Sequence, residues 1–600
     1  MSQINRIRII TLAMGLIVIG SGLIFMLQSG NQVPKPVPDK PPGSTRADAA
    51  YVTSDACREC HQRHYTTWHD SYHRTMTQSA TPETVLAKFD GVRLESRGQS
   101  FQLSRRGDEF FATRLSDDQQ SNASGESRAI VMTTGSHLMQ TYWVAVGNEF
   151  LQLPWFFNIE EQMWIPSEDS FLTPPSEKRL TARWNDTCIK CHSTGAVPGY
   201  DRSSGFETTV AELGISCEAC HGPGERHVTF HRATKSEDPA VIAAAAMVNP
   251  EKISHVAASQ ICGQCHSSSQ ARDPIDWLKN GSRYRPGEDH TESFRHAKIG
   301  STEPFDAPYL KDSFWNDGTC RVGGDELLGL HDSACYQQGK MSCLSCHSMH
   351  DSDPTDQLRF SNDSNESCLQ CHEQYRDQIE QHSHHPVGSS GSQCANCHMP
   401  HTSFALLKAI RSHRVDSPRT TDSTLGARPN ACNLCHLDQS LQWTATHLSD
   451  WYGVPRITMS ETDQKTSASL LWLLRGNAIQ RAIAAWGMSW QPAREVSGSD
   501  WQAPFLAETL LDPYSVVRFV GWRSLKKLPG FDDFEYDFLA ADAERSASRT
   551  RAVDQWKSQP ATIDKEQAAR VLLTPAGQPD VDATQQILDQ RDDRTIDILE

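Results

Sequence analysis

Hydrophobic residues gather in one long run near the start of the chain. Residues 9–27 form a stretch of nineteen residues without a charge, and Arg6 and Arg8 precede it. A run of this length can cross a bilayer as a helix, whereas a cleaved signal peptide would have a shorter apolar core that ends in a small-x-small site. The pattern predicts an uncleaved membrane anchor over residues 1–30, with its basic end inside, and a semi-rigid linker over residues 31–50.

A second pattern, alternation of apolar and polar residues, follows further along. It is seen in residues 92–94, 101–103 and 111–115, and Gly107-Asp108 between the last two is a turn signal. Alternation with period two is typical of strands that bury one face. The pattern predicts a small antiparallel sheet inserted at residues 85–165.

Helical periodicity dominates the last third of the chain. Residues 468–476, 477–486 and 505–518 repeat apolar positions at helical spacing. The Asp-Pro step inside the last of these runs resembles a HEAT-type helix pair, although two such units are too few for a free-standing solenoid. We predict an all-α, HEAT-like region over residues 465–540 and a charged tail over residues 541–600.

Between these stretches the body is rich in loops and contains eight copies of Cys-x-x-Cys-His, which use sixteen of the eighteen cysteines. The cysteines are Cys57, Cys60, Cys188, Cys191, Cys217, Cys220, Cys262, Cys265, Cys343, Cys346, Cys368, Cys371, Cys394, Cys397, Cys432 and Cys435. The histidines that follow them are His61, His192, His221, His266, His347, His372, His398 and His436. We number the motifs one to eight in this order.

The spacing has a chemical reason. Two thiols three positions apart can each add to one vinyl group of a porphyrin, and the next histidine then binds the iron. A zinc site would need a second ligand pair to complete its tetrahedron, and it would not require a histidine after every cysteine pair. Disulfides do not require this spacing at all. The sequence predicts eight covalently attached c-type haems. Cys320 and Cys335 remain, either as a disulfide or as two buried thiols.

Composition agrees with a core built largely from porphyrin. Only 38% of the residues are hydrophobic, and the formal net charge is -17. A strongly acidic chain lacks the basic footprint that nucleic acid requires, so nucleic acid is excluded as a partner. The acidic excess serves solubility or steers a basic redox partner.

Several motifs have neighbours that resemble known octahaem c-type cytochromes, namely the cytochrome c-552/c-554 family and the hydroxylamine oxidoreductase-like proteins. The resemblance depends on Ser71-Tyr-His73, on Cys220-His221-Gly-Pro-Gly-Glu-Arg-His227, on His398-Met-Pro400 and on Ser412-His413. It implies a mainly α and irregular multihaem cytochrome c fold over residues 51–450, with the predicted sheet as an insert.

A second iron ligand is expected from histidines outside the motifs. The resemblance implies this role for His73, His227 and His413. His350 follows motif five too closely to serve the same iron, so it is expected to serve a neighbouring one. His137 is either a ligand or an ordinary hydrogen-bonded core histidine, and His447 is a candidate on a helix. For the two remaining irons the candidates are His255, His296 and His331.

Two functions agree with these features. One is an electron carrier in which two histidines bind every iron. The other is an oxidoreductase in which one open haem acts on a nitrogen or sulfur compound. In the nitrite and tetrathionate reductases that the body resembles, lysine replaces the motif histidine of the catalytic haem, but all eight motifs here end in histidine. We expect the carrier, located in the inner membrane with its body in the periplasm, and redox proteins or quinol-linked membrane complexes as partners.

Overall fold

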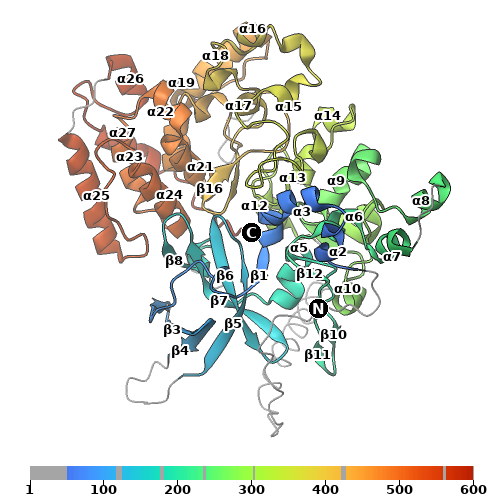
Figure 1. Cartoon of the computed structure of the whole chain (residues 1–600). Helices are drawn as coiled ribbons and strands as arrows, with labels where there is room; N and C mark the ends of the chain where they lie inside the picture. Colours follow the sequence, from blue (N-terminus) through green and yellow to red (C-terminus); the bar gives the residue numbers. More distant parts are fainter. Residues whose placement is uncertain are drawn as a thin grey trace, which may run out of the picture.

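The computed structural model describes residues 51–598, except for 116–124, 176, 178–180, 234–237, 302–304, 421–426 and 559–562. Figure 1 shows three regions: an antiparallel sheet, a group of helices from the last third of the chain, and a loop-rich body that contains the Cys-x-x-Cys-His motifs.

The alternating segment forms the predicted sheet. The strands pair in chain order, and they are β2 (Arg93–Ser96), β3 (Gln99–Arg106), β4 (Glu109–Arg114), β5 (Ser127–Thr134), β6 (Met139–Val146), β7 (Glu149–Asn158) and β8 (Met163–Pro166). Strand β1 (Thr77–Ser79) also pairs with β5. Gly107 adopts a φ of 62° in the β3–β4 turn, a conformation that glycine adopts without steric cost. Leu103, Phe110 and Tyr142 are buried in a core on this sheet.

The C-terminal helices share one apolar core. They are α20 (Ala468–Arg475), α21 (Ala478–Ser489), α22 (Gln491–Ser497), α23 (Ala503–Thr509), α24 (Ser515–Leu525), α25 (Asp542–Lys557), α26 (Lys565–Arg570) and α27 (Val581–Leu588). Asn477 caps α21 through a capping box with Gln480. The helices lie together on one side of the molecule in Figure 1.

The HEAT-like arrangement predicted for these helices is not confirmed. Helix α25 packs across α23, and the last described residues return to the core, where Ile596 and Ile598 are buried. The backbone N–H of Ile596 donates to the Tyr514 hydroxyl. A closed core of this kind differs from stacked helix pairs, which contact only their neighbours. The expected charged tail is therefore helical and packed.

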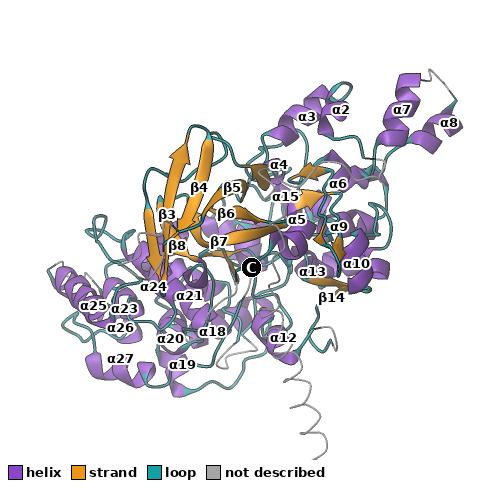
Figure 2. Cartoon of the chain, turned by 90° about the horizontal axis from the view of Figure 1, so that it is seen from below, coloured by secondary structure: helices purple, strands orange, loops and turns teal. Residues whose placement is uncertain are grey.

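The loop-rich body is built from short helices, several of which begin or end at a motif. They include α2 (Ser54–Arg58), α3 (Gln62–His69), α6 (Cys217–His221), α7 (Glu225–Ala233), α8 (Pro239–Ala245), α9 (His255–Gly263), α16 (Ile379–Ser383), α17 (Cys394–His398) and α18 (Leu441–Tyr452). Figure 2 shows α7 and α8 standing away from the rest of this body. Cys320 is buried and donates to the Asp325 carbonyl, and Cys335 is also a free thiol, so no disulfide joins them.

The predicted location in the inner membrane is corrected by the structure. Within the part of the chain that the structure describes, no helix is long and apolar enough to cross a bilayer. The run on which that prediction depends, residues 9–27, lies outside the described residues. The prediction of a single N-terminal spanning helix with the body in the periplasm is therefore withdrawn.

One buried ion pair should control the stability of the helical region. Arg481 and Asp512 are 1% and 3% exposed, and Arg481 Nε lies 2.6 Å from Asp512 Oδ2. Removing one partner of such a pair leaves an uncompensated buried charge. We expect Arg481→Ala to lower the free energy of unfolding by about 3–5 kcal/mol, measured by guanidinium unfolding followed by circular dichroism. The control Lys465→Ala, which breaks an exposed pair with Glu461, should leave the unfolding midpoint unchanged.

Candidate haem-binding cavity

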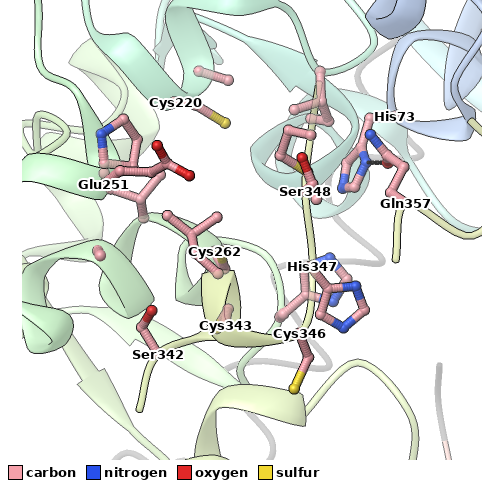
Figure 3. A pocket seen from close by; sticks show the side chains of 18 of the residues that line it. His73, Cys220, Glu251, Cys262, Ser342, Cys343, Cys346, His347, Ser348 and Gln357 are labelled. Atoms are coloured by element: carbon pink, nitrogen blue, oxygen red, sulfur yellow. Dashed lines mark hydrogen bonds between the residues drawn. The ribbon is translucent and has the colours of Figure 1, made fainter. Parts of the chain in front are cut away.

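A large cavity runs through the loop-rich body. Its volume is about 1880 Å³, above the range of about 300–1,000 Å³ that is usual for a small-molecule pocket. Ten motif cysteines and seven of the eight motif histidines line it. Figure 3 shows part of this lining, with Cys262 beside Cys343 and His347 close to His73. The cavity therefore brings together motifs that lie far apart in the sequence.

Thiols of different motifs lie near enough to affect one another. In four pairs each thiol shifts the pKa of the other: Cys57–Cys217, Cys191–Cys265, Cys262–Cys343 and Cys368–Cys394. Three more pairs interact electrostatically: Cys220–Cys262, Cys346–Cys371 and Cys397–Cys432. These interactions connect motif one to three, three to four, and then four to eight in sequence order. Motif two joins the series at motif four, so the series contains all eight motifs.

Six motif histidines lie opposite a second imidazole, with ring centres 6.0–6.5 Å apart. The pairs are His61–His227, His221–His350, His266–His73, His347–His413, His398–His382 and His436–His385. Two imidazoles that bind one metal ion from opposite sides, through bonds of about 2.0–2.1 Å, have ring centres roughly 6 Å apart. The observed spacing therefore fits a metal held between each pair.

Two family models match the chain. The doubled CXXCH motif matches residues 336–377, and cytochrome c554 and c-prime matches residues 56–99 and 169–222. These ranges contain motifs one, two, three, five and six. The chain is a multihaem c-type cytochrome. Its cofactor is covalently bound c-type haem.

Comparison with other proteins adds two structural likenesses. The outer cell wall cytochrome OcwA aligns with a TM-score of 0.48 and 16% identity, over 80% of this chain and 99% of that one. The Wolinella succinogenes octaheme sulfite reductase MccA aligns with a TM-score of 0.32 and 13% identity, over 88% and 86%. Scores this low establish neither a shared overall fold nor a shared activity. No curated protein matches the sequence.

Hydrogen bonds at Nδ1 fix the tautomer of several imidazoles of this cytochrome. A backbone carbonyl faces Nδ1 of His221 at 2.7 Å, of His398 at 2.9 Å, of His227 at 3.3 Å and of His385 at 2.6 Å. Because a carbonyl can only accept, Nδ1 must carry the proton. Nε2 then keeps its lone pair, and the hydrogen bond fixes the orientation of the ring.

Burial keeps several motif imidazoles of the cytochrome uncharged. The pKa of His192, of His347 and of His436 is lowered to about 4 in each case, and burial is the largest cause. Neighbouring imidazoles contribute to the decrease at the last two. A metal ligand must be the neutral imidazole, so these side chains need not lose a proton at neutral pH in order to bind iron.

Motif four differs because a carboxylate supports its histidine. Nδ1 of His266 lies 2.9 Å from Oε2 of Glu326, and both side chains line the cavity. Burial lowers the pKa of His266, but the bond to Glu326 outweighs it and raises that pKa to about 8. Burial raises the pKa of Glu326, and the same bond brings it down to about 2. Glu326 is therefore ionised, and it makes the His266 ring a stronger electron donor.

The histidines predicted as second ligands fall into two groups. The structure places His73, His227, His350 and His413 opposite motif histidines. His73 also bonds through Nδ1 to Gln357, as Figure 3 shows. His64 lies 6.3 Å from His61 as well, but the two are three positions apart and face the same side of one turn.

The remaining candidates lie elsewhere. His137 stacks on Tyr72 at 4.0 Å. His447 lies between Trp443 and Trp451. The ring contacts of the last three candidates are with Tyr336 for His255 and His331, and with His290 for His296. Ligation by any of these residues stays a prediction.

The sequence did not single out His382 and His385, which the structure places opposite His398 and His436. Both belong to a polar, histidine-rich segment that reads as solvated, because charged and polar histidine clusters are usually exposed. Two histidines at short spacing after motif six do not by themselves indicate that they face other motifs. That becomes visible only when the fold shows motifs seven and eight beside them.

The carboxylate at motif four should set the potential of one haem. A stronger ligand stabilises the oxidised iron, so Glu326→Gln should raise the midpoint potential of one haem and leave the others near their original values. Spectroelectrochemical titration of the purified protein would measure this. Glu251→Gln, which changes another carboxylate that lines the cavity but pairs with Arg359, is the matched control. Unchanged potentials in Glu326→Gln would contradict the assigned role.

Proposed function

We propose that this cytochrome binds eight c-type haems and carries electrons along them. The observation that supports the proposal is the series of interactions between neighbouring motif thiols, which links all eight motifs around one cavity. Each haem supplies a one-electron iron couple when bound. The chain contributes a scaffold that keeps eight such groups next to one another.

The second part of the proposal concerns the ligands. The imidazole pairs at motifs one, three, four, five, seven and eight would each hold one iron from both sides. The second imidazole comes from outside the motif in every case, and from a distant segment for His73 at motif four and His413 at motif five. With both axial positions taken by protein, no position is left for a small ligand. This arrangement suits electron transfer and excludes substrate from the iron.

A donor and an acceptor are required as partners. We propose redox proteins or quinol-linked complexes for these roles, because eight coupled one-electron groups can gain and lose electrons only by exchange with other redox groups. The formal net charge of -17 would favour a basic partner through long-range attraction.

An oxidoreductase is the second candidate, and one observation favours it. Among the described residues, no second histidine ring contacts His192 of motif two or His372 of motif six. Nδ1 of His192 is buried without a hydrogen-bond partner. An open axial position at either motif would admit a nitrogen or sulfur compound, as at one open haem of an octahaem enzyme.

Carbon monoxide separates the two functions. We expect that no more than about two of eight haems in the reduced protein respond, because six irons are closed by imidazole pairs. The measurement is the absorbance change on titration with carbon monoxide. A response from three or more haems would contradict the ligand pairs. Turnover of hydroxylamine, nitrite or a sulfur oxyanion that is lost on His192→Ala or His372→Ala would establish the oxidoreductase instead.

A further inference from the structure

One short segment provides the second imidazole for two motifs. Helix α16 ends at Ser383, and its C-cap residue His384 adopts a left-handed conformation with φ 56° and ψ 28°. On one side of this turn, His382 lies 6.1 Å from His398 of motif seven, and the two rings are nearly parallel at 7°. On the other side, His385 lies 6.0 Å from His436 of motif eight. The left-handed residue therefore separates two imidazoles that face different motifs.

The end of helix α18 contacts this segment at two points. The His384 ring stacks on Trp451 with 4.2 Å between centres and 12° between planes. The Tyr452 hydroxyl donates to the carbonyl of His382. A residue other than glycine persists in the left-handed region when its surroundings fix it there. The stack on Trp451 provides that constraint.

Trp451 is the last member of a column of aromatic rings along helix α18. Residues at intervals of four lie on one face of a helix, and on α18 these are Trp443, His447 and Trp451. Their rings are 4.4 Å and 4.5 Å apart in succession, and Trp443 lies 4.7 Å from His436. The column extends from motif eight to the point where His384 stacks, and Trp451 is 37% exposed at its end.

His385 has an additional constraint that His382 lacks. Its Nδ1–H donates to the carbonyl of Ser383 at 2.6 Å, which leaves Nε2 free. Gly391 leaves the space that the ring needs, because a Cβ at that position would lie 2.1 Å from Cδ2 of His385. A side chain at Gly391 would therefore displace His385 and leave His382 in place.

We propose that Trp451 and Tyr452 are positioning residues that hold His382 and His385 in register with motifs seven and eight at the same time. The inference depends on the imidazole pairs of the proposed function. Loss of the Trp451 ring would free His384, and with it both flanking histidines. Two haems would then lose their second ligand together, although Trp451 contacts neither His382 nor His385 in the described pairs.

The test counts the haems that become open in the full-length, haem-loaded protein. Relative to wild type, Trp451→Ala should make about two more of the eight haems high-spin and responsive to carbon monoxide. Trp451→Leu, which keeps apolar volume and removes the aromatic ring, should do the same, and Trp451→Phe should restore the wild-type count. Gly391→Ala should open about one haem. The readouts are electron paramagnetic resonance of the oxidised protein and carbon monoxide titration of the reduced protein.

Controls separate this inference from the ligand assignment. Asp450→Ala removes an exposed ion pair with Arg456 on the same helix and should change nothing. His382→Ala and His385→Ala should open one haem each. If they do, and Trp451→Ala and Trp451→Leu leave the count at the wild-type value or open one haem only, the positioning role is overturned alone. If neither histidine variant opens a haem, the proposed ligand pairs are wrong and the positioning role falls with them.

Discussion

The spacing of roughly 6 Å between a motif imidazole and a second imidazole from another part of the chain is the constraint on which this structure depends. His227 follows motif three and faces motif one, while His73 follows motif one and faces motif four. His413 follows motif seven and faces motif five. Each pair therefore connects segments that the sequence separates. In a body with short helices, haems held between such pairs would provide apolar surface that a larger hydrophobic core would otherwise provide.

The same constraint explains why the motifs form one series. A second imidazole must come within reach of its partner, so the segment that carries it must run beside another motif. The interactions between the thiols of Cys57 and Cys217, and of Cys262 and Cys343, show the same proximity of motifs. The proposed electron transfer needs neighbouring redox groups, and motifs arranged in this way would hold haems next to one another. Glu326 bonds to the His266 ring, so the histidine of motif four differs from the other motif histidines in its hydrogen-bond partner.

Local chemistry could be predicted from the sequence, and long-range pairing could not. The cysteines and the motif histidine lie within five residues, so haem binding can be predicted from one short stretch of sequence. The sheet around Gly107 follows from alternation, which is also local. His382 and His385 gave no such signal, because their placement opposite His398 and His436 depends on where the fold puts motifs seven and eight. The helices after residue 465 were predicted, but their HEAT-like stacking was not confirmed, because Ile596 and Ile598 close the core from the far end of the chain.

The most direct test of the account is a ligand map of the haem-loaded protein from a crystal or cryo-electron microscopy structure. The account predicts eight haems. It predicts His73 on the iron of motif four, His227 on motif one, His350 on motif three and His413 on motif five, with His382 and His385 on motifs seven and eight. Irons at these six motifs that carry water, no ligand, or a residue such as His137 or His447 would contradict the claim that paired imidazoles from distant segments organise this fold.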